Sequence, residues 1–124
     1  MEHEVLVIDD VEEIVEILTE YIRLSEKQLN ISAAKNGKEG LELLDKKKYS
    51  VIFVDYRMPI LNGGEVLVQL REGSSKNKET PVIFVTANEE EAHPYIIKYA
   101  NVLLITKPFQ IKKLIATLNL LIKN

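Results

Sequence analysis

Five apolar runs of strand length, each followed by a stretch of helical periodicity, constrain the fold more than any other feature of this sequence. Four runs are continuous and rich in Val, Ile and Leu, which is typical of strands buried on both faces of a parallel sheet. The run at 29–34 alternates instead and predicts a less buried edge strand. The predicted strands cover residues 4–9, 29–34, 50–55, 82–86 and 102–106.

Between these runs, apolar residues repeat at intervals of three and four, which places one apolar stripe on each helix. The predicted helices cover about 11–22, 37–45, 64–71 and 110–122. The helix after residue 86 is predicted to be short or broken near Pro94, because proline is costly beyond the first helical turn. Such alternation predicts an α/β fold with a doubly wound parallel sheet and helices on both faces.

Size and composition bound the class of protein. The 124 residues are expected to form a single domain, 1–124, since a chain of this length buries one core. No apolar run approaches the ~20 residues that span a bilayer, and the first residues lack the basic start of a signal peptide, so a soluble, cytoplasmic protein is expected. A net charge of −3 with scattered basic residues indicates neither nucleic acid nor membrane as a partner.

Polar residues stand at the carboxyl ends of four predicted strands. Asp9 closes the first strand and Asp10 follows it. Asp55 closes the third strand, Thr86 closes the fourth, and Lys107 follows the fifth. Ligand sites in open parallel sheets form beyond this edge, where strand order reverses. Asp55 is the most informative, because Asp is disfavoured in strands and a charge near a core is costly unless it is paired or coordinated.

Several of these residues also have a purely structural interpretation. Asp10 with Glu13 fits an N-terminal capping box, and Thr86 with Asn88 fits the cap of the next helix. Lys107 fits a solvated loop residue. The meeting of three carboxylates, a hydroxyl and an ammonium at one sheet edge nevertheless favours a functional site.

Three converging carboxylates favour a divalent cation. Two carboxylates about 4 Å apart repel by ~4 kcal/mol at an effective dielectric constant near 20, so such a cluster shifts a pKa or binds a cation. Oxygen donors without nearby His or Cys favour Mg²⁺, or Mn²⁺, which also accept phosphate oxygens. With that charge offset, Asp55 can attack phosphorus and form an acyl phosphate. Thr86 and Lys107 can then contact the phosphoryl oxygens.

The same residues resemble the receiver domains of two-component response regulators, and the resemblance covers essentially the whole chain. Four segments together, at the ends of the first, third, fourth and fifth strands, make it highly specific. They are Val7-Ile8-Asp9-Asp10, Val54-Asp55-Tyr56-Arg57-Met58-Pro59 with Asn62-Gly63, Val85-Thr86-Ala87, and Lys107-Pro108-Phe109.

This resemblance implies a flavodoxin-like (βα)5 fold of strand order 2-1-3-4-5 and a cis Lys107–Pro108 bond. It implies that Asp55 is the phosphoacceptor, Thr86 the switch hydroxyl and Lys107 the phosphate partner. The residues implied for Mg²⁺ are Asp9, Asp10, Asp55 and, through its backbone carbonyl, Arg57.

The resemblance also implies a regulatory domain rather than an enzyme with an external substrate. The phosphoryl donor would be a phosphohistidine on a sensor histidine kinase or histidine phosphotransfer domain. A downstream protein would bind the face formed by the fourth helix, fifth strand and fifth helix. The protein would be a monomer or a phosphorylation-dependent homodimer, and it would act alone or as one domain of a larger regulator.

Three positions are expected to modulate the switch. Leu104 stands where receiver domains carry Tyr or Phe, which removes the usual ring movement, and Tyr99 is an alternative aromatic residue nearby. Arg57 and Asn88 lie two residues after Asp55 and Thr86 and flank the entrance to the site in this family. Arg57 is expected to shield or pair with the acyl phosphate, unless it is a solvent-facing loop residue.

Two other functions remain open from the sequence. A degenerate receiver would keep the fold as an interaction module without accepting phosphate, which Leu104 mildly favours and the complete acidic set disfavours. An aspartate-nucleophile phosphohydrolase commonly carries a second Asp two residues after the nucleophile. This chain has Arg57 at that position.

Overall fold

The computed structural model describes residues 3–25 and 27–122, and over these residues strands and helices alternate without exception. The strands are β1 (His3–Ile8), β2 (Leu29–Ala34), β3 (Val51–Asp55), β4 (Val82–Thr86) and β5 (Val102–Thr106). The helices are α1 (Glu12–Arg23), α2 (Gly37–Lys46), α3 (Gly63–Glu72), α4 (Glu89–Lys98) and α5 (Ile111–Leu121). Most predicted boundaries lie within about one residue of these.

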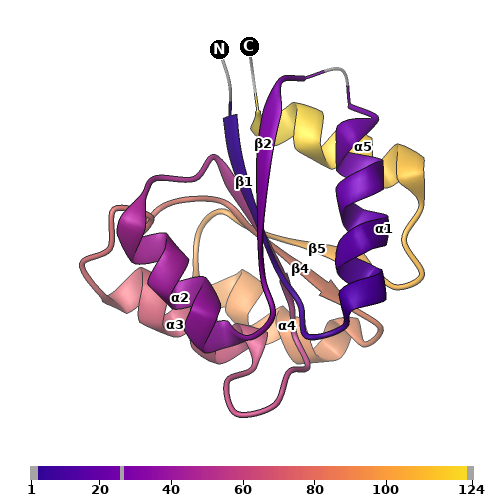
Figure 1. The fold of residues 1–124 in the computed structure, drawn as a ribbon. Coiled ribbons are helices and arrows are strands. Elements are labelled where there is room, and N and C mark those ends of the chain that lie inside the picture. Colours follow the sequence, from indigo (N-terminus) through magenta and orange to yellow (C-terminus); the bar gives the residue numbers. More distant parts are fainter. Residues whose placement is uncertain (1–2, 26, 123–124) are drawn as a thin grey trace.

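All five strands are parallel and form one sheet of order β2-β1-β3-β4-β5. Figure 1 shows α1 and α5 on one face of the sheet and α2, α3 and α4 on the other. The predicted doubly wound fold and its strand order are therefore confirmed. The strand order reverses between β1 and β3, so the edge beyond the carboxyl ends of these two strands is where a ligand site is expected.

The core consists of two layers, one on each face of the sheet. Along β1, Val5 and Val7 pack toward α1 and α5, whereas Leu6 and Ile8 pack toward α2, α3 and α4. Every residue of β3 and β4 is buried, as continuous apolar runs predict, while β2 at the edge is mostly half-buried or exposed. The central strands are thus rigid supports for the side chains at their ends.

The prediction that α4 is short or broken near Pro94 is wrong. The helix runs unbroken from Glu89 to Lys98 with Pro94 inside it. Proline has no N–H, so α4 lacks the hydrogen bond that residue 94 would donate to the Glu90 carbonyl. Ala92 is fully buried and Tyr95 packs against the core, so tertiary packing holds the helix together despite the missing bond.

A buried asparagine in the α3–β4 connection fixes the entry into β3. Asn77 is fully buried, and its Oδ1 accepts hydrogen bonds from the Tyr49 amide at 2.7 Å and the Thr80 hydroxyl at 3.0 Å. Its Nδ2 donates to the carbonyls of Leu44 at 2.7 Å and Lys47 at 2.8 Å. One amide group thereby ties the end of α2 to the start of the strand that carries Asp55 at its other end.

Replacement of Asn77 by Ala is expected to lower the free energy of unfolding by about 2–4 kcal/mol, because several buried polar groups would lose their partners. Urea unfolding followed by circular dichroism measures this loss. Lys76→Ala removes an exposed neighbouring side chain and is expected to change stability by less than about 0.5 kcal/mol. Equal stability of the two variants would contradict the role given to the amide.

Candidate functional site

Three carboxylates meet at the sheet edge where the strand order reverses. Asp55 is the last residue of β3, and Asp9 and Asp10 directly follow β1. One carboxylate oxygen from each residue lies within 4.8 Å of the others. Asp9 is 1% exposed and Asp55 is 6% exposed, whereas Asp10 is exposed. Two buried acids and one exposed acid therefore share a single small volume.

Lys107 and Thr86 come from the neighbouring strand ends. The Nζ of Lys107 lies 3.3 Å from Oδ1 of Asp55, and the Lys107 amide donates to the Thr86 carbonyl at 2.8 Å. The bond between Lys107 and Pro108 is cis, as implied by the resemblance. Thr86 is buried, and its Oγ1 accepts a hydrogen bond from the Asn88 amide at 3.1 Å. The structure thus gives Asp55 one cation and leaves the Thr86 hydroxyl engaged with the start of α4.

A close approach of the chain to β3 shapes the rim beside Asp55. After β3 the chain turns, and the Gly63 amide donates to the Tyr56 carbonyl at 2.8 Å. A Cβ at Gly63 would lie 2.7 Å from the Asp55 carbonyl oxygen, a distance that side chains do not tolerate. Glycine is therefore what allows the start of α3 to lie against the end of β3.

The structural interpretations of these residues have mixed outcomes. The capping box of Asp10 with Glu13 is not formed, because Val11 is the N-cap of α1 and no side chain caps it. Instead, Oδ1 of Asp9 accepts a hydrogen bond from the Val11 amide at 2.9 Å. Asn88 does cap α4, since its Oδ1 accepts from the Glu90 amide at 3.1 Å.

Burial and mutual repulsion disfavour the ionised form of the acidic cluster, which lacks enough positive charge nearby to offset them. Burial, reinforced by the charges of Asp55 and Asp10, raises the pKa of Asp9 to about 6. Burial also raises the pKa of Asp55, although the Lys107 ammonium opposes that shift. In the part of the chain that the structure describes, Oδ2 of Asp9 is buried without a hydrogen-bond partner. A site with an unpaired buried oxygen and three carboxylates fits a hard divalent cation with oxygen ligands.

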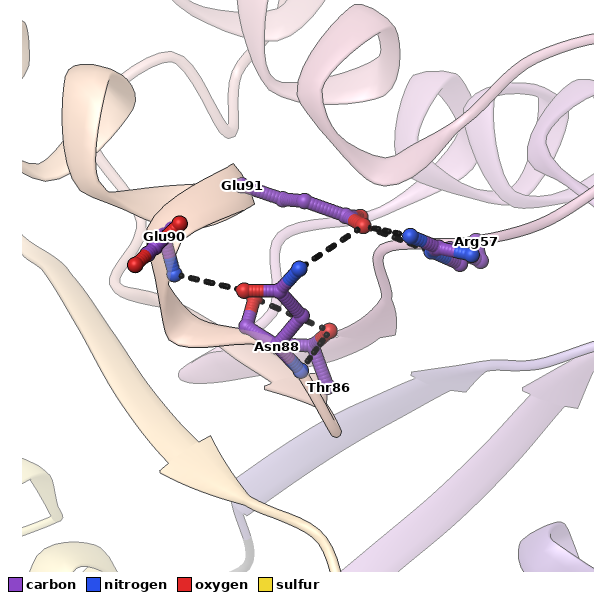
Figure 2. A network of polar contacts seen from close by, with 5 residues as sticks. All are labelled: Arg57, Thr86, Asn88, Glu90 and Glu91. Atoms are coloured by element: carbon purple, nitrogen blue, oxygen red, sulfur yellow. Dashed lines mark hydrogen bonds and ion pairs between the residues drawn. The ribbon is translucent and has the colours of Figure 1, made fainter.

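Two of the three positions predicted to modulate the switch, Arg57 and Asn88, contact Glu91 of α4. Nε of Arg57 donates to Oε1 of Glu91 at 2.7 Å, and Nη2 of Arg57 contacts the same oxygen. Asn88 Nδ2 reaches that oxygen at 3.5 Å. Figure 2 shows the Glu91 side chain extended from α4 toward the Arg57 nitrogens. Glu91 was not predicted from the sequence, where it stands in a run of acids that opens a helix.

The aromatic residues near the site are not the one predicted from the sequence, Tyr99. Leu104 is half-buried in β5, and the Tyr99 hydroxyl donates to Glu72 of α3 at 2.7 Å. Tyr56, Phe84 and Tyr95 instead form a three-ring cluster with centroid separations of 5.8–6.0 Å. This cluster links Tyr56, the residue after Asp55, to α4. In the sequence, only the position of Tyr56 directly after Asp55 pointed to it.

Comparison with known proteins decides the family, since the model of the response regulator receiver domain matches residues 5–119. The chain belongs to this family. The transcriptional regulatory protein SrrA of Staphylococcus aureus is 36% identical over 93 residues, which are 75% of this chain and 36% of SrrA. The receiver domain thus spans about a third of the curated relatives that it matches.

Solved receiver structures show the same fold. The receiver domain of the Francisella response regulator 1452 superposes with a TM-score of 0.77 at 32% identity, covering 96% of this chain and 95% of that one. The receiver domain of the sensor histidine kinase PA1611 from Pseudomonas aeruginosa gives a TM-score of 0.84 at 20% identity over 100% of both chains. That structure contains a magnesium ion in its active-site cleft. Within the described residues of the present chain, no helix is both long and apolar enough to cross a membrane.

Neutralisation of Asp9 is expected to stabilise the metal-free protein at neutral pH. Because the pKa of Asp9 is raised to about 6 in the folded state, ionisation of this group between pH 4 and 6 opposes folding. Asp9→Asn is therefore expected to raise the free energy of unfolding by ~1–3 kcal/mol at pH 7, and the gain should vanish toward pH 4. Denaturant unfolding with a chelator present, at several pH values, measures it.

Asp10→Asn serves as the matched control, since that carboxylate is exposed and its neutralisation should stabilise the protein less. A gain for Asp9→Asn that is the same at pH 4 and pH 7 would contradict the assignment. Addition of Mg²⁺ should raise the thermal midpoint of the parent protein more than that of either variant, because a ligand stabilises the state that binds it.

Proposed function

We propose that this receiver domain is a phosphorylation-controlled signalling switch and that Asp55 is its phosphoacceptor. The observation that carries the proposal is the position of the Asp55 carboxylate. It lies at the end of a fully buried strand, 3.3 Å from the Lys107 ammonium and in one cluster with Asp9 and Asp10. A rigid strand that aims a nucleophile at a site rich in charge is the arrangement that phosphoryl transfer requires.

Phosphoryl transfer would proceed by attack of an Asp55 carboxylate oxygen on the phosphorus of a phosphohistidine. A P–O bond forms as the P–N bond breaks, and the imidazole nitrogen leaves with the electron pair and is protonated. Lys107, already beside Asp55, moves to a phosphoryl oxygen and offsets its charge. The Thr86 hydroxyl, which now donates to the Asn88 carbonyl at 3.4 Å, turns to donate to another phosphoryl oxygen.

The acidic cluster is proposed to hold Mg²⁺ or Mn²⁺. The ligands would be the carboxylates of Asp9, Asp10 and Asp55 together with the backbone carbonyl of Arg57. When bound, the ion supplies positive charge that offsets repulsion between the carboxylates and the incoming phosphoryl group. The unpaired buried oxygen of Asp9 and its raised pKa support this assignment.

The output is proposed to pass through α4. The Asn88 side chain accepts a hydrogen bond from an amide in the first turn of α4, and the backbone amide of Asn88 donates to Oγ1 of Thr86. Movement of the Thr86 hydroxyl would therefore disturb the N-terminal cap of the helix. Leu104 in β5 lines a shallow cavity with His93 and Pro94 of α4. A change there would alter the α4–β5–α5 face to which the downstream protein binds.

The remaining assignments follow from family membership. We propose that residues 1–124 act as one cytoplasmic domain whose donor is a sensor histidine kinase or a histidine phosphotransfer domain. The domain has no external substrate and contacts no nucleic acid itself. It acts as a monomer or as a homodimer that forms on phosphorylation.

Incubation of the protein with acetyl phosphate and Mg²⁺ is expected to add one phosphoryl group to Asp55, detected by intact mass and by peptide mapping. The adduct should be stable in acid and labile in base, as an acyl phosphate is. Asp55→Asn should abolish it, whereas Asp45→Asn, which neutralises an exposed acid at the end of α2, should not. Absence of an adduct in the parent protein would favour a degenerate receiver, and turnover of many added esters would favour a hydrolase.

Loss of Arg57 is expected to shorten the lifetime of that adduct. Arg57→Ala removes a cation two residues after Asp55 that would shield the acyl phosphate from water. Loss of the phosphoryl group should therefore be about two- to fivefold faster, a modest effect because the side chain is exposed. The decay of the adduct mass after removal of acetyl phosphate measures this rate. An unchanged rate would remove Arg57 from the mechanism.

A further inference from the structure

A single carboxylate oxygen on α4 holds the side chains that flank the site entrance. Oε1 of Glu91 accepts from Nε of Arg57 at 2.7 Å, from Nη2 of the same residue, and from Nδ2 of Asn88 at 3.5 Å. Glu91 is largely covered, with 19% of its side chain exposed, whereas Arg57 is 74% exposed. Glu91 is therefore the more covered partner of the pair that Figure 2 shows, and Arg57 is the more exposed one.

Packing of α4 fixes the place of Glu91. Tyr95 follows Glu91 by four residues, so the two side chains lie on the same face of α4. The ring of Tyr95 lies 6.0 Å from that of Tyr56, the residue that precedes Arg57. A Cβ at Gly64 would lie 2.4 Å from Tyr95 Cζ, so the absence of a side chain there admits the ring. Two consecutive residues after Asp55 thus contact two residues one turn apart on α4.

The two nitrogens that bind Glu91 matter for phosphoryl chemistry. Nε and Nη2 form one edge of the guanidinium, and such an edge binds an oxyanion through two parallel N–H bonds. While Glu91 occupies this edge of Arg57, a phosphoryl group on Asp55 cannot use it. Lys107 remains the cation in contact with Asp55.

We propose that Glu91 is a positioning residue that holds the Arg57 guanidinium on α4 and thereby limits its contact with the phosphoryl group on Asp55. The inference rests on the proposed function of Asp55. An exposed ion pair is weak, and a phosphoryl group carries up to two negative charges, so Arg57 divides its time between Glu91 and the phosphoryl oxygens. Glu91 sets that division and so shortens the lifetime of the acyl phosphate.

The test measures the first-order loss of the phosphoryl group after acetyl phosphate and Mg²⁺ are removed, by intact mass, for the full chain and its variants. Glu91→Gln keeps the shape of the side chain and removes its charge, which should free Arg57 and slow the loss about two- to fivefold. Glu91→Asp keeps the charge, and the exposed Arg57 can follow the shorter side chain, so its rate should stay near that of the parent. If Glu91 acted through packing alone, the shortened side chain of Glu91→Asp would change the rate of phosphoryl loss more than Glu91→Gln does.

Glu90→Gln provides the matched control. It removes the same charge from the same helical turn, but the Glu90 carboxylate points away from Arg57 in Figure 2, so the rate should not change. In the Arg57→Ala background, Glu91→Gln should have no further effect, since the two residues act through one contact.

Equal effects of Glu91→Gln with and without Arg57, or equal effects of Glu90→Gln and Glu91→Gln, would overturn the positioning role. A faster loss in Glu91→Gln would overturn it as well. These outcomes require that Asp55 be phosphorylated and so leave the proposed function intact. A parent protein that takes no phosphoryl group would instead overturn both the proposed function and this inference.

Discussion

Repulsion among Asp9, Asp10 and Asp55 is the interaction on which the rest of the site depends. Three carboxylates have oxygens within 4.8 Å of one another, and two of the three side chains are buried, so their joint ionisation costs free energy unless a cation offsets the charge. The fold tolerates them because β1 and β3 are buried and rigid, and because Lys107 reaches Asp55 from the end of β5. The remaining deficit of positive charge makes this edge suited to a metal ion with oxygen ligands.

Helix α4 receives several contacts from residues at this edge of the sheet. Its N-cap is Asn88, whose backbone amide donates to the Thr86 hydroxyl oxygen. Its first turn carries Glu91, which accepts from the Arg57 guanidinium. One turn further on, Tyr95 packs on Tyr56. The surroundings of Asp55 are thus physically linked to α4. These links run through the β3–α3 and β4–α4 connections.

The sequence predicts the sheet well and the contacts between loops poorly. Buried parallel strands appear as continuous apolar runs, so β3 and β4 were predicted almost to the residue, and the polar residues at their ends led to Asp55 and Thr86. The course of α4 was not predictable from Pro94 alone, because the burial of Ala92 and Tyr95 that stabilises the helix is a tertiary effect. Likewise, the partner of Arg57 depends on how α4 sits on the β3–α3 loop, which no local pattern encodes.

The absence of a side chain at Gly64 affects which amino acids related domains can carry at positions 64 and 95. Because the Tyr95 ring fills the volume that a side chain at position 64 would need, we expect the two positions to change together. In a homologue with a larger residue at 64, the side chain at 95 is either smaller or displaced, and the contact with Tyr56 is lost. Paired variation at these two sites across an alignment would trace which lineages have kept this arrangement of α4.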